Sequence, residues 1–154
     1  MDFKWADYRS YEKNVELWID DDAKKYTGCE DGWEPYFSYW ESDPETSVGE
    51  NFWGKVVLEN DIPVAVMAIG LNEDVFTVSE FIVDPKKRGR GFGSAILKDL
   101  ISNSAEILGK RIKTAEACIY PNNIASQKAF EKSGFSFSYA HEDGDAWYYK
   151  ITVE

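Results

Sequence analysis

A short loop from Lys87 to Ser94, with the sequence KRGRGFGS, has the residue types of an anion-binding site. Glycine adopts positive φ without strain, so Gly89, Gly91 and Gly93 allow the backbone to turn sharply and expose consecutive N–H groups. Apolar residues at three- and four-residue spacing follow, which predicts that the loop opens a helix. Because the first turn of a helix has unpaired N–H donors and the positive end of the dipole, the loop predicts a site for phosphate or pyrophosphate.

Side chains of the same loop could strengthen this site. Arg88 and Arg90 would add positive charge from the sides, and Ser94 could donate a hydroxyl hydrogen bond. The glycine spacing is G-x-G-x-G rather than the dinucleotide-binding G-x-G-x-x-G, and the Gly-Lys-Ser/Thr of a nucleotide P-loop is missing. Two alternatives stay open, namely a tight strand-to-helix turn without a ligand and an Arg-Gly segment that contacts RNA.

The charge distribution indicates which partners the loop can have. The chain has a net charge of −11, and residues 1–60 contain 15 acidic and 6 basic side chains. Residues 84–113 reverse the balance, with 8 basic and 3 acidic side chains. An acidic chain repels nucleic acid and anionic membranes, so we expect neither as a partner. The basic segment favours a small anion, although its lysines could also form a solvated face.

Length and cysteine content narrow the class of protein further. The 154 residues fit one domain with its own core. Cys29 and Cys118 lie far apart, and His141 is the only histidine, so no zinc site is expected and we predict no metal. Both cysteines are predicted to be reduced and buried. No signal peptide or membrane span is visible, which favours a cytoplasmic protein.

The expected elements alternate in a way that favours one α/β domain. Hydrophobic periodicity and turn residues predict a mixed, mostly antiparallel sheet flanked by helices. Residues 42–50 read as a loop. The expected strands are 3–9, 52–59, 63–71, 74–85, 111–120, 135–142 and 146–153, and the expected helices are 10–27, 33–41, 91–108 and 123–133.

Two segments in sequence order resemble the signature of the GNAT family of N-acetyltransferases. The first, VSEFIVDPKKRGRGFGSAILKDLI, contains the family pattern Arg/Gln-x-x-Gly-x-Gly/Ala at positions 88–93. The second, NIASQKAFEKSGF at positions 123–135, is similar to the family pattern Asn-x-x-Ser/Ala-x-x-x-Tyr/Phe-Glu-Lys-x-Gly-Phe. The resemblance covers residues 51–153 well and the first 50 only in element order. It implies a single GNAT domain, with acceptor-side helices in 1–50 and the acetyl-CoA-binding core in 51–154.

The resemblance implies acetyl-CoA as the acetyl donor. Its pantetheine arm would pair with the strand ending at Val83, which bulges and splays away from strand 111–120 in this family. An N–H near Ile82 or Val83 would then bind the thioester carbonyl. The expected cofactor-binding residues are Phe81, Ile82, Val83, Arg88, Gly89, Arg90, Gly91, Phe92, Gly93, Ser94, Asn123, Ser126 and Phe130. Asn123 could equally be a plain N-cap, and both roles can coexist.

The implied chemistry is direct attack of a neutral amine on the thioester, which needs a proton acceptor and a proton donor. Glu80 is the expected general base. Strand alternation puts Glu80 and Phe81 on opposite faces, and a bulge could switch which of the two faces the cleft. The alternative is an exposed, salt-bridging Glu80. Many family members donate the proton from a Tyr at the position of Phe130, so Tyr120 is the expected substitute here. Tyr148 and Tyr149 are weaker candidates. The missing Tyr also suggests an alternative function, a non-catalytic acyl-CoA-binding module.

The acceptor is predicted from the composition of the first third of the chain. That region combines acidic residues with many aromatic ones, a combination that favours a cationic guest. We therefore expect a small amine or a peptide amine; alternatively the aromatics are core and the acids are surface. The family also forms homodimers commonly, and the sequence does not decide this point. The aromatics are Trp5, Trp18, Tyr26, Trp33, Tyr36, Phe37, Tyr39, Trp40 and Trp53.

Overall fold

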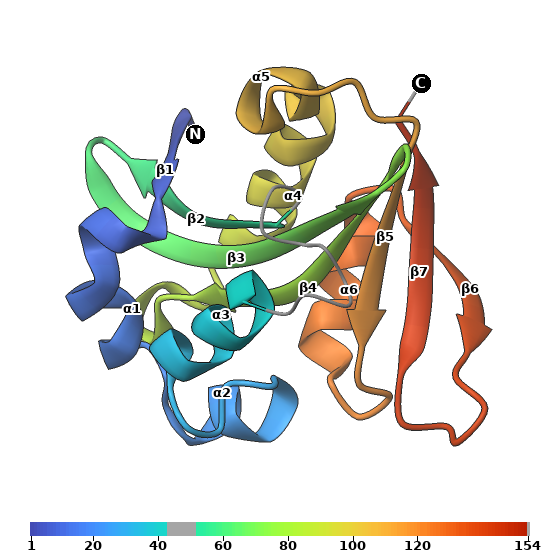
Figure 1. Cartoon of the computed structure of the whole chain (residues 1–154), viewed down its shortest axis with the longest axis horizontal. Coiled ribbons are helices and arrows are strands. Elements are labelled where there is room, and N and C mark those ends of the chain that lie inside the picture. Colours follow the sequence, from blue (N-terminus) through green and yellow to red (C-terminus); the bar gives the residue numbers. More distant parts are fainter. Residues whose placement is uncertain (43–51, 154) are drawn as a thin grey trace.

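A computed structural model describes residues 1–42 and 52–153, with side chains left undescribed in 39–42. Seven strands form one sheet in the order β1-β2-β3-β4-β5-β7-β6 (Figure 1). The strands are β1 (Phe3–Asp7), β2 (Phe52–Glu59), β3 (Ile62–Asn72), β4 (Val75–Val83), β5 (Thr114–Ile119), β6 (Ser136–Ala140) and β7 (Trp147–Thr152). The helices are α1 (Glu12–Leu17), α2 (Asp21–Tyr26), α3 (Trp33–Ser42), α4 (Phe92–Ser102), α5 (Ser104–Leu108) and α6 (Ile124–Lys132), with 3-10 turns η1 (Tyr8–Tyr11) and η3 (Pro85–Lys87).

All neighbouring strands are antiparallel except β4 and β5, which run parallel. The parallel pair is joined by the crossover that contains the glycine loop, α4 and α5. A parallel pair needs such a connection because the chain must return to the same end of the sheet. The predicted fold class, a mixed and mostly antiparallel sheet flanked by helices, is confirmed.

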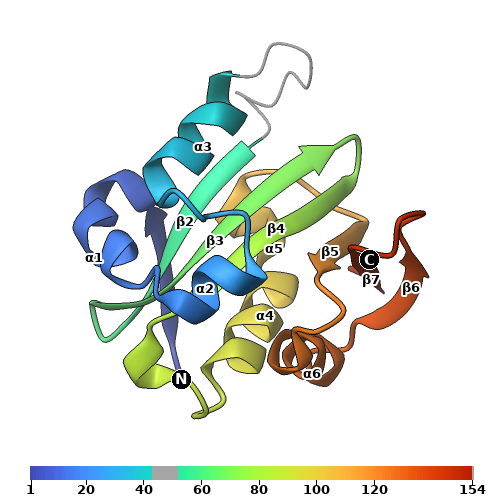
Figure 2. The ribbon, with the colours of Figure 1, turned by 90° about the horizontal axis from the view of Figure 1, so that it is seen from below.

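Helices cover both faces of the sheet and bury two hydrophobic clusters. Helices α1, α2 and α3 lie on one face, and α4, α5 and α6 on the other (Figures 1 and 2). The α4–α6 side buries Phe76, Ile96, Leu100 and Phe130, while the α1–α3 side buries Trp33. We call the side covered by α4–α6 the back face of the sheet and the side covered by α1–α3 the front face.

One glycine is required where α3 packs on the front face. A Cβ placed on Gly54 of β2 would lie 2.4 Å from a ring carbon of Phe37 and 2.5 Å from one of Tyr8. These distances are shorter than any van der Waals contact, so only glycine lets α3 approach the sheet this closely. The aromatic residues of this region, Trp18, Trp33 and Phe37, are therefore core, as the alternative interpretation held.

The structure corrects two of the predicted helices. Residues 10–27 form η1, α1 and α2 instead of one helix, because Asp20 has extended backbone and its carboxylate caps a new helix through the amide of Ala23. Residues 91–108 are divided at Asn103, whose φ of −123° and ψ of 22° are not helical. Periodicity alone could not locate either break, since both lie within amphipathic sequence.

Smaller differences concern strand ends and cysteines. The first strand ends at Asp7, and β5 is shorter than predicted, beginning at Thr114. Cys29 is buried as predicted, but Cys118 is only half-buried. The predicted loop at 42–50 falls almost entirely outside the described residues, as do the side chains of Tyr39 and Trp40. Within residues 1–42 and 52–153, the structure contains no helix with the length and apolar character of a membrane span.

Candidate acetyl-transfer site

A bulge at Ser79 divides β4 into two halves with different neighbours. Val78 pairs with Ile69 and Glu80 with Ala68, so Ser79 is the extra residue. The first half of β4 pairs with β5 only from Val75 to Val78. Beyond the bulge β4 and β5 diverge, as Figure 1 shows. From Glu80 to Val83, the edge of β4 that faces β5 pairs with no strand among the described residues, while the other edge stays paired with β3.

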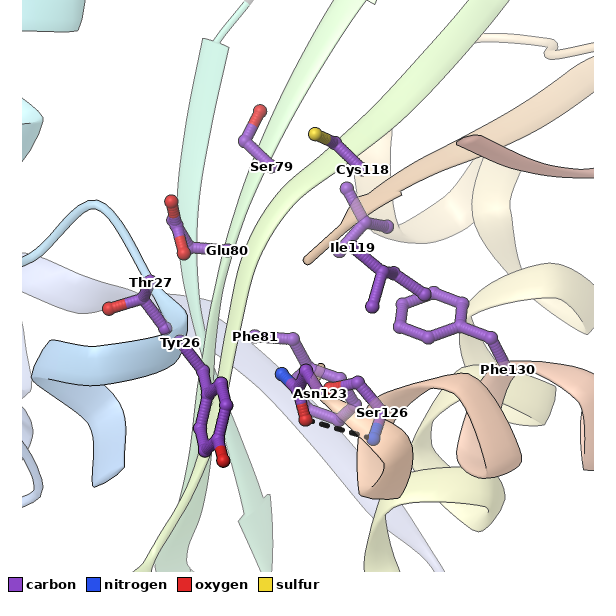
Figure 3. Close-up of a pocket in the computed structure, with 11 residues that line it drawn as sticks. Tyr26, Thr27, Ser79, Glu80, Phe81, Cys118, Ile119, Asn123, Ser126 and Phe130 are labelled. Carbon is purple, nitrogen blue, oxygen red and sulfur yellow. Dashed lines mark hydrogen bonds between the residues drawn. The ribbon is translucent and has the colours of Figure 1, made fainter. Parts of the chain in front are cut away.

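The bulge also decides which way Glu80 points. Side chains alternate along a strand, and Val78 belongs to the back-face cluster, so a regular strand would place Glu80 there as well. With one extra residue, Glu80 joins Ala68 and Ile82 on the front face, while Phe81 turns to the back. Figure 3 shows Glu80 projecting toward Thr27 and Phe81 projecting toward Asn123.

Glu80 is enclosed by polar groups of the segment that connects α2 to α3. Its Oε1 accepts a hydrogen bond of 2.9 Å from the amide of Gly28. Burial raises the pKa of Glu80 to about 7, although the Gly28 amide acts in the opposite direction. A carboxylate that titrates near neutral pH is suited to accept a proton from a bound amine.

Four other titratable groups surround Glu80, and all of them stay neutral near pH 7. Burial raises the pKa of the Cys29 thiol to about 12, and burial together with Glu80 raises the pKa of Tyr36. Burial likewise raises the pKa of Cys118 and of Tyr120. Glu80 is therefore the group in this cluster that changes charge in the neutral range.

Two adjoining cavities lie beside the splayed end of β4, and Glu80 lines the smaller one. A small one, of about 30 Å³, lies in the gap between β4 and β5 and is lined by Ser79, Glu80 and Cys118, among others (Figure 3). This volume suffices for a water molecule. A groove of about 500 Å³ runs from there between α2, the splayed end of β4, the glycine loop and α6. Tyr26, Thr27 and Phe81 line both, so the two spaces are continuous.

The glycine loop forms one end of the groove. Gly89 and Gly91 have φ values of 77° and 81°, and a Cβ on either residue would meet no atom within 4 Å. Both glycines are therefore needed for the backbone conformation and leave open space beside the loop. Helix α4 begins directly afterwards at Phe92, with Gly91 as its N-cap. A Cβ on Gly93 would make an ordinary van der Waals contact of 3.4 Å with that of Ala129, so α4 and α6 pack against each other at this position.

The sequence profile described as the acetyltransferase (GNAT) family matches residues 11–135. The chain belongs to the GNAT family of acetyltransferases. It is thus an acetyl-CoA-dependent N-acetyltransferase, and the predicted family is confirmed. A search of curated proteins found no similar sequence.

Solved structures share the GNAT fold at low sequence identity. A domain from Methanocaldococcus jannaschii has a TM-score of 0.73 and 20% identity, with 98% of each chain covered. Aminoglycoside acetyltransferase AAC(6')-Ib in complex with coenzyme A has a TM-score of 0.72 and 14% identity, with 97% of this chain and 93% of that one covered. The N-acetyltransferase PseH from Campylobacter jejuni, in complex with acetyl coenzyme A, has a TM-score of 0.68 and 12% identity, with 98% and 99% covered.

The GNAT motif residues on α6 have local roles as well as positions on the groove. The Asn123 side-chain oxygen accepts a hydrogen bond of 3.2 Å from the amide of Ser126, so Asn123 caps α6 while lining both cavities. Phe130 is buried and packs edge-on against Phe81 and Phe135. Tyr120 follows β5 but lines neither cavity.

The loop side chains differ in what they contact. Ser94 lines the groove, and its hydroxyl donates a weak hydrogen bond of 3.4 Å to the carbonyl of Gly91. Arg90 is exposed, and the guanidinium of Arg88 is bound to Asp20.

No role in the site was predicted for several residues that the structure places there. Lys128 and Lys132 line the groove, and their four-residue spacing on one face of α6 was a usable signal. Thr27 and Cys118 line the small cavity, and Gly28 donates its amide to Glu80.

No group of three or more His, Cys, Asp or Glu side chains suited to a metal ion is found in the part of the chain that the structure describes.

Proposed function

We propose that this GNAT protein transfers an acetyl group from acetyl-CoA to the primary amine of a small cationic acceptor, by direct attack in a ternary complex. The observation that carries the proposal is the position of Glu80. The bulge at Ser79 turns this carboxylate toward the small cavity in the gap between β4 and β5, which adjoins the groove. A base with a pKa of about 7 there can take the proton that an ammonium group must lose before it attacks.

The groove fits the phosphates and the pantetheine arm of the cofactor. The space beside Gly89 and Gly91 is open at the start of α4, where the unpaired amides of a helix N-terminus favour a diphosphate. Lys87, Lys128 and Lys132 line the same groove and match further anionic groups. We assign the diphosphate to the loop amides from Arg88 to Ser94.

The splayed edge of β4 provides main-chain groups for the pantetheine and the thioester. The amide of Asp84 donates to the carbonyl of Val64 at 2.8 Å. Because antiparallel pairs alternate, the amide of Ile82 also points to β3, while those of Phe81 and Val83 point to the gap. We therefore assign Val83 rather than Ile82, together with Phe81, to pairing with the cofactor arm and the thioester carbonyl.

The remaining chemistry is proton transfer and alignment. Glu80 takes a proton from the bound amine, directly or through a water molecule in the small cavity, and the groove holds the acceptor and the thioester together. The departing thiolate needs a proton, which we assign to Tyr120. Burial, and after it the Glu80 carboxylate, raises the pKa of Tyr120, so this hydroxyl keeps its proton at neutral pH.

The acceptor side is polar and carries negative charge. Tyr26 lines the groove, and Tyr36 shares a hydrogen bond with Ser79 next to Glu80. A second carboxylate, Glu116 of β5, points to the same face, accepts hydrogen bonds from Thr77 and Tyr139, and lies 4.0 Å from the ammonium of Lys150. Carboxylates and aromatic rings together favour a cation, which supports an amine that carries positive charge beyond the reacting nitrogen.

The test is an assay of thiol release from acetyl-CoA with a panel of polyamines, aminoglycosides, amino acids and peptides. We expect turnover with at least one amine and a large loss of kcat in Glu80→Gln, with the acetyl-CoA dissociation constant unchanged. As a matched control, Glu106→Gln replaces an exposed carboxylate on α5 and should leave the kinetics unchanged. Binding of acetyl-CoA without turnover of any amine would instead favour the non-catalytic acyl-CoA-binding module.

A further inference from the structure

Arg88, the first residue of the glycine motif, connects three segments of the protein. Its Nη1 and Nη2 donate to the two carboxylate oxygens of Asp20, at 2.9 Å and 3.4 Å. Its Nε donates to the carbonyl of Val83 at 3.2 Å. All three nitrogens of the guanidinium are thus engaged by acceptors of the protein itself, and the charge of Arg88 is opposed by a carboxylate in contact with it.

Asp20 in turn fixes the beginning of α2. Its Oδ1 accepts a hydrogen bond of 2.9 Å from the amide of Ala23, so the carboxylate is the N-cap of this helix. Burial by itself would raise the pKa of Asp20, but the Ala23 amide and Arg88 hold it below its ordinary value. Asp20 therefore remains ionised, and the ion pair with Arg88 persists, throughout the neutral range.

The C-terminal end of α2 is attached to β4, the strand that also contains Val83. Gly28, two residues after the helix, donates its amide to Glu80 at 2.9 Å. Helix α2 is only six residues long and buries a single side chain, Ala23. Its packing is too slight to fix its position, so the contacts at its two ends must do so.

Helix α2, which is held at both ends, forms one wall of the groove. Asp22, Ala23 and Tyr26 line it opposite the splayed edge of β4. A displacement of α2 would widen the part of the groove that lies nearest to the thioester end, and would move Gly28 away from Glu80.

We infer that Arg88 and Asp20 are positioning residues: their ion pair holds α2 against β4 and so shapes the pantetheine part of the groove. In this role the guanidinium acts on the cofactor through α2, while the diphosphate is left to the main-chain amides and to other cations. This inference rests on the proposed acetyl-CoA groove and gives Arg88 a different role from the direct phosphate contact that its place in the motif predicts.

The experiment compares acetyl-CoA with S-acetylpantetheine, which has the thioester and the arm but no phosphate. The variants are Arg88→Ala and Asp20→Asn, the second of which keeps an N-capping side chain while removing the charge. We expect both variants to lower kcat/KM for the two donors by similar factors, about tenfold, because a bidentate pair between partly buried groups is lost. The double variant should be no worse than either single one.

A direct phosphate contact predicts a different pattern. Arg88→Ala would then impair the use of acetyl-CoA alone, and Asp20→Asn would leave it unchanged or improve it. That result would overturn the inference. Arg88→Lys gives a further comparison, since lysine keeps the charge but cannot form the fork to Asp20 and Val83. We expect Arg88→Lys to resemble Arg88→Ala with both donors.

A pH profile and hydrogen exchange separate this role from a general loss of stability. When α2 loosens, Glu80 loses the Gly28 amide and becomes more exposed, so the acid limb of kcat/KM should shift from its wild-type position in Arg88→Ala and Asp20→Asn. Amides from Ala23 to Gly28 should exchange faster, while those of α4 are unchanged. An unmoved limb would refute the inference. If the wild-type protein acetylates no amine, the proposed function fails, yet S-acetylpantetheine binding and exchange still test the ion pair.

Discussion

Glu80 and Gly28 lie 52 residues apart in sequence and share a hydrogen bond of 2.9 Å from the Gly28 amide to Oε1 of Glu80. This contact holds the half-buried carboxylate on the front face of the sheet, next to the gap between β4 and β5. A Cβ on Gly28 would lie 3.1 Å from the same oxygen, so the segment after α2 fits closely around the carboxylate. Both the activity and the stability of the protein should depend on this arrangement.

The pH dependence of activity is the first consequence. We expect kcat/KM to rise with pH through about 7, because Glu80 must lose its proton before it can act as a base. Glu80→Gln should lower kcat by roughly 10²- to 10⁴-fold, the usual contribution of general base catalysis, and should abolish the limb near 7. Rates measured from pH 5.5 to 9 check this. A limb that persists in Glu80→Gln would assign it to another group.

The free energy of unfolding should fall as the pH rises, whereas the activity should increase. The folded pKa of Glu80, about 7, lies above the ordinary value of 4.5, so the folded state binds its proton more tightly than the unfolded state. The free energy of unfolding therefore falls as the pH rises from about 4.5 to 7 and stays reduced above that, by about 3 kcal/mol at most. Glutamine does not titrate, so Glu80→Gln should stabilise the protein more at pH 8 than at pH 5. Urea unfolding at both values measures the difference; equal changes would contradict it.

The phosphate site can be tested with a pair of matched glycines. Gly91 and Gly109 both have left-handed backbone, with φ values of 81° and 72°, and in both cases a Cβ would meet no atom within 4 Å. Only Gly91 lines the groove. Gly91→Asp should raise the acetyl-CoA dissociation constant at least tenfold through its negative charge, whereas Gly109→Asp should not change it. Isothermal titration measures binding, and equal effects of the two variants would place the diphosphate elsewhere.

The proton donor can be tested by removing single hydroxyl groups. Tyr120→Phe should lower kcat by about 10- to 100-fold, with little effect on acetyl-CoA binding, because only the protonation of the leaving thiolate is affected. Tyr148→Phe is the comparison, since it likewise removes a single hydroxyl group, which in Tyr148 shares a hydrogen bond with the Cys118 thiol. A larger loss in Tyr148→Phe than in Tyr120→Phe would reverse the assignment.

The sequence by itself determined the glycine loop, the capped start of α6 and the family. These features are local: the loop amides, the glycines that permit positive φ and the helix that follows are contiguous in the chain, so their spacing contains the whole pattern. The sheet could also be predicted, because turn residues and alternating apolar residues mark each strand. Helices α1 and α2 could not be separated in this way, because the break at Asp20 depends on a cap within continuous amphipathic sequence.

Only the tertiary structure decided the direction in which Glu80 points and the partner that Arg88 binds. The direction of Glu80 depends on a single extra residue, Ser79, and a bulge arises from the register between β3 and β4 rather than from the residues of β4 alone. The partner of Arg88 lies 68 residues away at the start of α2. Such contacts form because helices pack on a sheet and bring distant segments together, and short-range sequence patterns carry no information about that packing.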